Sequence, residues 1–423
     1  MTKIYKYELK TEKYQEIELP ENSKILTAQI QNHVPCIWVE VDPLIKKTVF
    51  RKFAFIPTGQ AVDPQSLYIA TLQFNGGSIV QHLYELTSIM HVNQVVIQTS
   101  NVGKSDIWDK IKGTIYGHAI GDAIGLGTEF LDKKQIAYYY PEGFSGYDQI
   151  IADKHRSRWR KGEWTDDTDQ MLCILESLIS KECIDELDVA KRIHTWAYAG
   201  GRGLGNTVYS VISSPNYFIE PHEVAKQVWI NSGKNLAANG AIMRTSVLGI
   251  WEFANLEKVK QNTENIAKIT HFDPRCVGSC VALTFAISKL LQNETDCEKI
   301  IDLTIDQTNK YDVRIKDFLE RSKNKNLDKL ELDEPKSIGY TLKAMGAGFW
   351  ALQQSDFKKA ILEIVNQGGD ADTNGAVAGG LLGAKLGFSG LPQDWVDGLL
   401  NKAKLNQLID QLIALMIKTG QMD

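Results

Sequence analysis

The sequence lacks the features of a membrane protein and of a secreted one. Its 423 residues contain no apolar run of the roughly 18 residues that a membrane-spanning helix needs. The first residues, MTKIYKYELK, contain no apolar segment typical of a secretory signal. The six cysteines have no regular spacing, which argues against a disulfide framework and for a reducing compartment. We therefore expect a cytoplasmic protein without a membrane-spanning segment.

An excess of positive charge is also absent. Lys and Arg number 47 against 52 Asp and Glu, which gives a formal net charge of −5 at pH 7. A protein that binds nucleic acid usually carries a basic patch or stripe, so we do not expect nucleic acid as a general partner. The apolar share of 43% is ordinary for a globular protein, and the length suffices for two domains.

The residue pattern changes near residue 100. Before it, short segments rich in β-branched and aromatic residues are separated by Pro, Gly, Asn and Asp. These segments predict a small antiparallel sandwich or barrel over residues 1–88. They are KYELKT, QEIELP, KILTAQIQN, PCIWVEVD, KTVFRKFAFIP and SLYIATLQF. It contains no catalytic cluster that we recognise. Residues 89–105 are interpreted as a linker with room for one more strand.

From about residue 106 the apolar residues recur with helical spacing. One face of DQMLCILESLIS carries Met171, Leu172, Leu175, Leu178 and Ile179. No βαβ alternation is visible, so we predict an all-α domain over residues 106–423. Cys276 and Cys280, with His271 nearby, allow a metal-site interpretation. The segment VGSCVALTFAISKLL favours instead an apolar helix in which free cysteines are buried.

Two segments of the helical half place acidic residues in unusual settings. In GTIYGHAIGDAIGLGTEF, glycines recur at 113, 117, 121 and 125, which predicts close packing of two helices, and Glu129 follows them. In GEWTDDTDQM, Thr165 stands where a helix N-cap would, with Asp166 and Asp167 in the first turn. Acidic residues favour helix N-termini, so capping alone would account for the second segment.

A third segment, QGGDADTNGAVAGG, contains Asp370, Asp372 and Thr373 among small residues. A turn that leads into a helix, with Thr373 or an aspartate as its cap, would account for it. Alternatively, the chain contains two sets of two Asp and one Thr, and such oxygen ligands suit Mg²⁺ or Mn²⁺. Two ions about 3.5–4 Å apart can orient a substrate and lower the pKa of a bound water. Only the fold could bring the two sets together.

Five segments, in this order, resemble those of the ADP-ribosylglycohydrolases: GTIYGHAIGDAIGLGTEF, GEWTDDTDQM, NGAIMR, THFDP and QGGDADTNGAVAGGLLGAKLG. That family includes the dinitrogenase reductase-activating glycohydrolase and the ADP-ribosylarginine and ADP-ribosylserine hydrolases. The resemblance covers roughly residues 107–400. It does not extend to the small all-β N-terminal domain predicted above. For the helical part it implies an all-α orthogonal helical bundle, with two Mg²⁺ or Mn²⁺ ions at the bottom of a cleft.

The resemblance also implies roles for individual residues. The metal ligands would be Thr165, Asp166, Asp167, Asp370, Asp372 and Thr373, and the catalytic residues Glu129, Asp167 and Asp370. Substrate would be bound by Asn239 and Gly240, near the diphosphate, and by His271 and Asp273 along the cleft. A capping or packing role for His271 is the alternative. Some arginine-directed bacterial members carry an Asp where Gly203 stands, which moves the catalytic weight to Glu129 and a metal-activated water.

The implied reaction is hydrolysis of an N- or O-glycosidic bond at C1″ of ADP-ribose. The implied partner is an ADP-ribosylated protein, modified for example on arginine, and nucleic acid would enter only as a modified substrate. An alternative is an immunity or binding protein that neutralises an ADP-ribosylating toxin, by hydrolysis or by occlusion, through its N-terminal domain. Two-metal phosphoryl transfer uses similar acids, but the sequence lacks a GxxxxGK loop.

Overall fold

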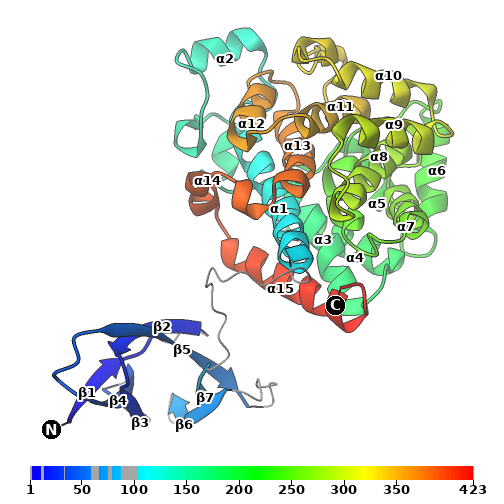
Figure 1. The fold of residues 1–423 in the computed structure, drawn as a ribbon. Coiled ribbons are helices and arrows are strands. Elements are labelled where there is room, and N and C mark those ends of the chain that lie inside the picture. The colour runs from blue at the N-terminus through cyan, green and yellow to red at the C-terminus, as the bar shows by residue number, and fades with distance from the viewer. Residues whose placement is uncertain are drawn as a thin grey trace. The chain divides into compact units, whose positions relative to one another are not determined.

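The computed structural model describes residues 2–10, 14–32, 34–58, 66–74, 79–86 and 102–422. The chain forms two compact units, Met1–Gln98 and Thr99–Asp423 (Figure 1). Of the predicted linker, residues 89–105, the part from 89 to 101 lies outside the described residues. The last four residues of the linker belong to helix α1 (Val102–Gly125).

The described part of the N-terminal unit consists of antiparallel strands in two sheets. One sheet has the order β1-β4-β3 and the other β2-β5-β7-β6. The strands are β1 (Lys3–Glu8), β2 (Tyr14–Pro20), β3 (Lys24–Gln31), β4 (Val34–Val41), β5 (Thr48–Pro57), β6 (Leu67–Phe74) and β7 (Ile79–Glu85). Apolar residues of both sheets form one core, among them Leu19, Ile37, Val39, Phe53, Phe55 and Leu83. The sequence analysis does not single out β7, where polar Gln81 and His82 interrupt the apolar pattern.

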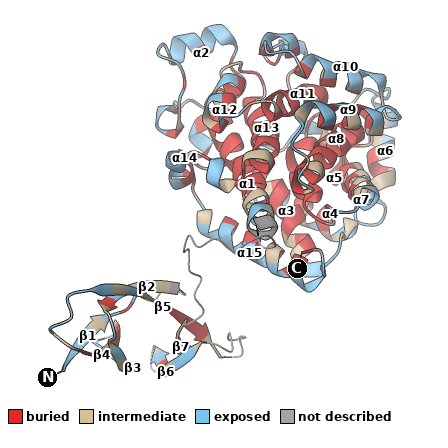
Figure 2. Ribbon diagram, in the orientation of Figure 1, coloured by how far each residue is buried: buried red, intermediate tan, exposed pale blue. Residues whose placement is uncertain are grey.

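The second unit is mostly helical, as predicted. Its helices after α1 are α2 (Lys133–Tyr139), α3 (Asp166–Lys181), α4 (Glu186–Tyr198), α5 (Asn206–Ile212), α6 (Pro221–Asn231), α7 (Leu256–Lys268), α8 (Pro274–Leu291), α9 (Cys297–Thr308), α10 (Val313–Ser322), α11 (Thr341–Leu352), α12 (Phe357–Val365), α13 (Ala371–Leu386), α14 (Gln393–Gly398) and α15 (Lys402–Lys418). Figure 2 shows buried residues concentrated on α1, α8, α11 and α13 at the centre of this unit.

Helix α8 is long and apolar enough, by length and composition, to cross a membrane, yet 89% of it is buried inside the unit. It is therefore a core helix. Cys276 and Cys280 lie on it as buried free thiols, and the Cys276 Sγ donates to the Ala238 carbonyl at 3.1 Å. This arrangement is the one that the apolar pattern favours over a metal site.

Helices α1 and α13 pack with their backbones in contact. A Cβ atom on Gly121 would lie 1.9 Å from the Gly375 carbonyl oxygen, and one on Gly117 would lie 2.2 Å from that of Gly379. The partners run in opposite order along the two helices, so the helices are antiparallel. Only glycine allows this approach, and the close packing predicted from the four-residue glycine repeat is confirmed. The pairing brings the end of α1 beside the start of α13 (Figure 1).

Candidate active site

A cavity of about 410 Å³ opens beside the start of α13. Its lining draws on the loop after α1 and the starts of α3, α5 and α13. Most of the site residues expected from the sequence line it: Glu129, Asp166, Asp167, Asn239, Gly240, His271, Asp370, Asp372 and Thr373. The fold thus brings together two acidic segments that are far apart in the sequence.

Thr165 links the elements beneath this cavity. It is the N-cap residue of α3, but its side chain makes no capping hydrogen bond. Its hydroxyl lies 2.8 Å from Asp122 Oδ1 and 3.3 Å from Asp372 Oδ2. Capping alone therefore does not account for GEWTDDTDQM, because the side chain of its N-cap residue faces the carboxylates of α1 and α13.

Asp122 on α1, a residue that the sequence analysis did not assign to the site, caps α3 in place of Thr165. Its two carboxylate oxygens accept hydrogen bonds from the backbone N–H of Thr165 at 2.9 Å and of Thr168 at 3.0 Å, and from both hydroxyls. Burial raises its pKa to about 7, although these hydrogen bonds act in the opposite direction. The signal was present in GDAIG, where an acid interrupts a glycine-rich helix face.

The segment QGGDADTNGAVAGG is built on a tight glycine turn. Gly368 and Gly369 have φ values of +79° and +69°, and a Cβ on Gly369 would lie 2.1 Å from the Leu332 carbonyl oxygen. Asp370 follows as the N-cap residue of α13, again without a side-chain capping bond. Its Oδ2 instead accepts a hydrogen bond of 2.7 Å from Asn239 Nδ2. The turn therefore aims an aspartate into the cavity rather than at the helix.

The carboxylates at the cavity repel one another. Single oxygens of Glu129, Asp370 and Asp372 all lie within 4.8 Å of each other. Burial, and then the neighbouring carboxylates, raise the pKa values of Asp166, Asp167 and Asp372 well above their ordinary value and that of Asp370 to about 6. Asp167 Oδ1 is buried without a hydrogen-bond partner. Such a cluster of oxygens favours a cation.

His271 lines the cavity with an unpartnered ring nitrogen. Arg244 Nη2 donates to the Thr270 hydroxyl oxygen at 2.5 Å, and that hydroxyl lies 2.8 Å from His271 Nδ1. Burial lowers the pKa of His271 to about 3, so the ring is neutral. Its Nε2 is buried and has no partner among the described residues. A neutral imidazole with one unpartnered nitrogen can contact a substrate there, as a donor or as an acceptor.

Asp273 does not join the cavity. It is the N-cap residue of α8, where its side chain accepts from the backbone N–H of Arg275 at 2.9 Å. The same carboxylate forms a buried ion pair with the Arg275 guanidinium at 2.6 Å and accepts from Trp229 Nε1 at 3.0 Å. The THFDP segment therefore supplies one cavity residue, His271, and one residue that fastens a helix.

Gly203 lies directly over an acidic residue of the cavity. It has φ +92°, and a Cβ there would lie 2.0 Å from Asp166 Oδ1. The position therefore has no room for the aspartate that some relatives were expected to carry. Two further residues escaped the sequence analysis: Phe130, which lines the cavity, and His155, whose Nε2 lies 2.6 Å from Glu129 Oε2. Phe130 directly follows Glu129 at the end of GTIYGHAIGDAIGLGTEF, whereas no spacing rule connects His155 with the acidic motifs.

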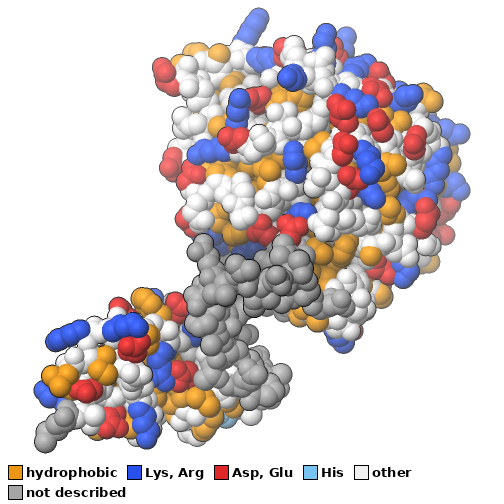
Figure 3. All heavy atoms as spheres, in the orientation of Figure 1, with side chains coloured by type: hydrophobic (Ala, Val, Ile, Leu, Met, Phe, Trp, Pro, Cys, Tyr) orange, Lys and Arg blue, Asp and Glu red, His pale blue; other side chains and the backbone are white. Residues whose placement is uncertain are grey.

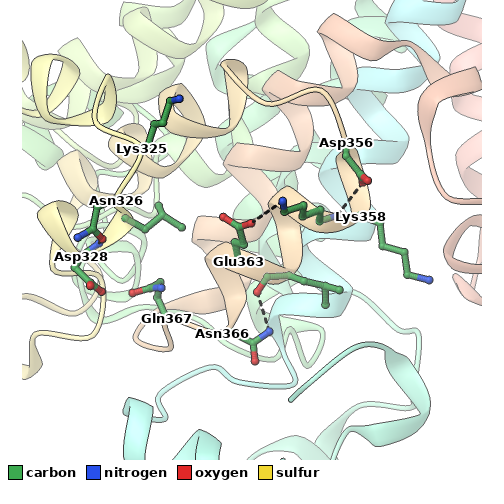
Figure 4. Close-up of a pocket in the computed structure, with 11 residues that line it drawn as sticks. Lys325, Asn326, Asp328, Asp356, Lys358, Glu363, Asn366 and Gln367 are labelled. Carbon is green, nitrogen blue, oxygen red and sulfur yellow. Dashed lines mark hydrogen bonds and ion pairs between the residues drawn. The ribbon is translucent and has the colours of Figure 1, made fainter. Parts of the chain in front are cut away.

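A larger hollow of about 700 Å³ lies over α12. Figure 4 shows that its labelled side chains are charged or polar. Two of these side chains have structural roles: Asp356 caps α12, and Lys358 forms an ion pair of 2.6 Å with Asp394. Figure 3 shows acidic and basic side chains interspersed over the visible face of the molecule. The smaller cavity, with its converging buried acids, is the stronger candidate for catalysis.

Comparisons with known proteins identify relatives of both parts of the chain. The profile of the ADP-ribosylglycohydrolase family matches residues 103–421, and that of a domain of unknown function, DUF7352, matches residues 1–92. The chain is 28% identical to an ADP-ribosylarginine hydrolase, Tri1, of Serratia proteamaculans, over 74% of this chain and 81% of that protein.

It is also 27% identical to the ADP-ribosyl-[dinitrogen reductase] glycohydrolase of Rhodospirillum rubrum, over 73% of this chain and 97% of that protein. Among solved structures, an ADP-ribosylglycohydrolase-related protein complex is similar with a TM-score of 0.58 and 25% identity, covering 74% of this chain and 99% of the other. By its sequence and its fold, the chain belongs to the ADP-ribosylglycohydrolases, hydrolases of glycosidic bonds.

Proposed function

We propose that this hydrolase removes ADP-ribose from arginine side chains of modified proteins, and that it uses two divalent cations, Mg²⁺ or Mn²⁺. The observation that carries this proposal is the convergence of like charges on one cavity: Glu129, Asp166, Asp167, Asp370 and Asp372. Among the described residues, no Lys or Arg forms an ion pair with these carboxylates, and His155, beside Glu129, is the one basic side chain that contacts any of them. Buried like charges are unfavourable unless something neutralises them.

The donor set fits two hard cations. Carboxylate and hydroxyl oxygens are the ligands that Mg²⁺ and Mn²⁺ prefer, and the unpartnered Asp167 Oδ1 is the kind of atom that an ion would engage. Ions bound there would orient the ribose hydroxyls and lower the pKa of a water. The residues that would hold them are Thr165, Asp166, Asp167, Asp370, Asp372 and Thr373.

Asp370 is the candidate general base. In the metal-free protein its pKa is raised to about 6, by burial and then by Glu129, and a bound cation would lower it and keep the carboxylate ionised, as a base must be. The hydrogen bond from Asn239 Nδ2 fixes one of its oxygens. Asp370 would accept the proton of the water that attacks C1″, while Glu129, across the same cavity, would orient the ribose or protonate the leaving group.

His271 and the segment beside it would bind the rest of the substrate. With its hydrogen on the unpartnered Nε2, His271 would donate to a phosphate or ribose oxygen in the cavity. A Cβ at Gly240 would lie 2.9 Å from His271 Cε1, so the glycine allows the ring to reach its place. Asn239 and Gly240 line the cavity next to it, where backbone N–H groups could approach a diphosphate.

The names of the relatives support arginine as the modified residue. The Serratia relative is an ADP-ribosylarginine hydrolase, and the Rhodospirillum relative acts on ADP-ribosylated dinitrogen reductase. Because Gly203 leaves no space for an acid, Glu129 and Asp370 would carry the proton transfers here.

The test is release of ADP-ribose from peptides modified on arginine or serine, and from modified nucleic acid, with Mg²⁺ or with a chelator. We expect release from the arginine peptide only, and only with metal. The double variant Asp370→Asn, Asp372→Asn should be inactive. The matched control, Asp356→Asn, changes an exposed helix cap outside the cavity and should be fully active, since Asn caps as well as Asp. Full activity of the double variant would refute the metal assignment, and release from serine alone would refute the substrate class.

A further inference from the structure

The loop that carries Glu129 is hydrogen-bonded to the glycine turn before Asp370. Phe130 N–H donates to the Gly369 carbonyl at 2.6 Å, and Gly369 N–H donates to the Leu131 carbonyl at 3.0 Å. Phe130 has φ +58°, a left-handed conformation that is unusual for a bulky residue. Such conformations persist where the surroundings determine them and occur often at functional sites. Here the backbone turn fixes where Glu129 stands relative to Asp370.

A buried arginine joins this loop to the segment before α3. Arg156 is 2% exposed, and its Nε donates to the Gly127 carbonyl at 3.0 Å. Its Nη2 donates to the Glu129 carbonyl, and its Nη1 forms an ion pair with Asp153 at 2.5 Å. The two loops are therefore fastened to each other. His155, the residue before Arg156 in the sequence, lies on this joined support.

His155 contacts Glu129 in a defined tautomer. Arg158 Nη2 lies 2.6 Å from His155 Nδ1, and a guanidinium can only donate. His155 Nδ1 therefore accepts, the ring hydrogen is on Nε2, and Nε2 donates to Glu129 Oε2 at 2.6 Å. The rings of Phe130 and Trp159 flank the imidazole, with centroids 5.2 and 5.5 Å away. The ring is thus held in both orientation and tautomer.

We propose that His155 is a positioning residue for Glu129, an inference that rests on the proposed function. Glu129 stands within 4.8 Å of the carboxylate oxygens of Asp370 and Asp372, which repel it. Without a donor, its side chain would turn away from them. The Nε2–H of His155 holds one carboxylate oxygen in place, so the other oxygen faces the cavity and the substrate.

The kinetic test compares two substitutions at this position. His155→Phe keeps a ring between Phe130 and Trp159 but removes the donor, and His155→Gln restores an N–H at similar reach. With the ADP-ribosylarginine peptide and Mg²⁺, we expect His155→Phe to lower kcat by about 10- to 100-fold, the usual effect of losing such a supporting hydrogen bond, with KM little changed. His155→Gln should recover most of kcat. Loss in both variants alike, or in neither, would overturn the inference.

A matched control and a mutant cycle separate positioning from general damage. His194 also stacks in an aromatic cluster, 4.3 Å from Tyr198, and does not line the cavity, so His194→Phe should keep wild-type kcat. Combined with Glu129→Ala, His155→Phe should cause no further loss, because the donor then has no acceptor to hold. If the double variant instead loses kcat by the product of the two single losses, the inference is overturned.

A crystal structure of His155→Phe tests the inference without any activity. We expect the Glu129 carboxylate to have turned away from Asp370 and Asp372. An unchanged Glu129 would overturn the positioning role. If the wild-type protein releases no ADP-ribose from any substrate, the proposed function fails, but the position of Glu129 in this variant still decides the inference.

Discussion

Two neighbouring glycines of α13 should respond to alanine in opposite directions. A Cβ on Gly379 would lie 2.0 Å from the Gly117 carbonyl oxygen of α1, whereas one on Gly380 would meet its first atom, Ser246 Cβ, at 3.5 Å. The first contact is far shorter than van der Waals contact, and the partner is backbone that cannot rotate away. The second is an ordinary packing distance.

The magnitudes follow from these distances. Gly379→Ala forces the two helices apart by about 1 Å or more, and overpacking of this kind typically costs about 1–3 kcal/mol. Gly380→Ala adds no clash, and replacing glycine by alanine inside a helix stabilises by up to about 1 kcal/mol. For a unit of this size, each kcal/mol shifts the melting temperature by roughly 2–4 °C. The two variants should therefore melt several degrees apart, on either side of the wild type.

Thermal unfolding followed by far-ultraviolet circular dichroism reports mainly on the helical unit. The melts should be recorded with a chelator, so that bound metal does not stabilise the folded state. A Gly379→Ala variant that melts at or above the wild-type temperature would refute the backbone contact between α1 and α13. Equal loss in both variants would show that glycine at these positions serves something other than close approach.

Three further predictions concern the site and the domains. Burial raises the folded-state pKa of Asp122 to about 7 and that of Asp372 well above the ordinary 3.8, so the stability that they contribute is full below pH 3.8 and is lost as pH rises through the folded values. The melting temperature of metal-free protein should therefore fall from pH 6.5 to 8, the window set by Asp122. Asp122→Asn should flatten that fall, and an equally steep fall in this variant would contradict the pKa assignment. Asp372→Asn should abolish the stabilisation by Mg²⁺. Gly203→Ala should reduce kcat by up to about 100-fold, because it displaces Asp166, whereas Gly205→Ala, whose Cβ meets nothing within 4 Å, should keep kcat close to wild type. Residues 99–423 have their own core and should release ADP-ribose from the arginine peptide without the N-terminal unit. Loss of that activity in the shortened protein would favour a catalytic role for the β domain. Capture of an ADP-ribosylating toxin by the full chain, but not by residues 99–423, would favour the immunity role.

The sequence by itself determined the features that depend on local repetition. The change from alternating to helical spacing separates the β unit from the helical unit, because strands and helices expose one face with different periods. Glycines at every fourth residue of α1 predict a close helix contact, and the two Thr and Asp sets identify the acidic segments. Each signal lies within a few turns of chain and needs no knowledge of its partner.

Only the tertiary structure decided which groups face one another. Asp122 replaces Thr165 as the cap of α3, His155 reaches Glu129, and Asp273 turns to Arg275 instead of the cavity. These contacts join segments whose meeting depends on how helix surfaces and loops fill space, and no spacing along the chain encodes that. The acids could be identified from their neighbours in sequence, but their arrangement as one cluster follows from the antiparallel packing of α1 against α13.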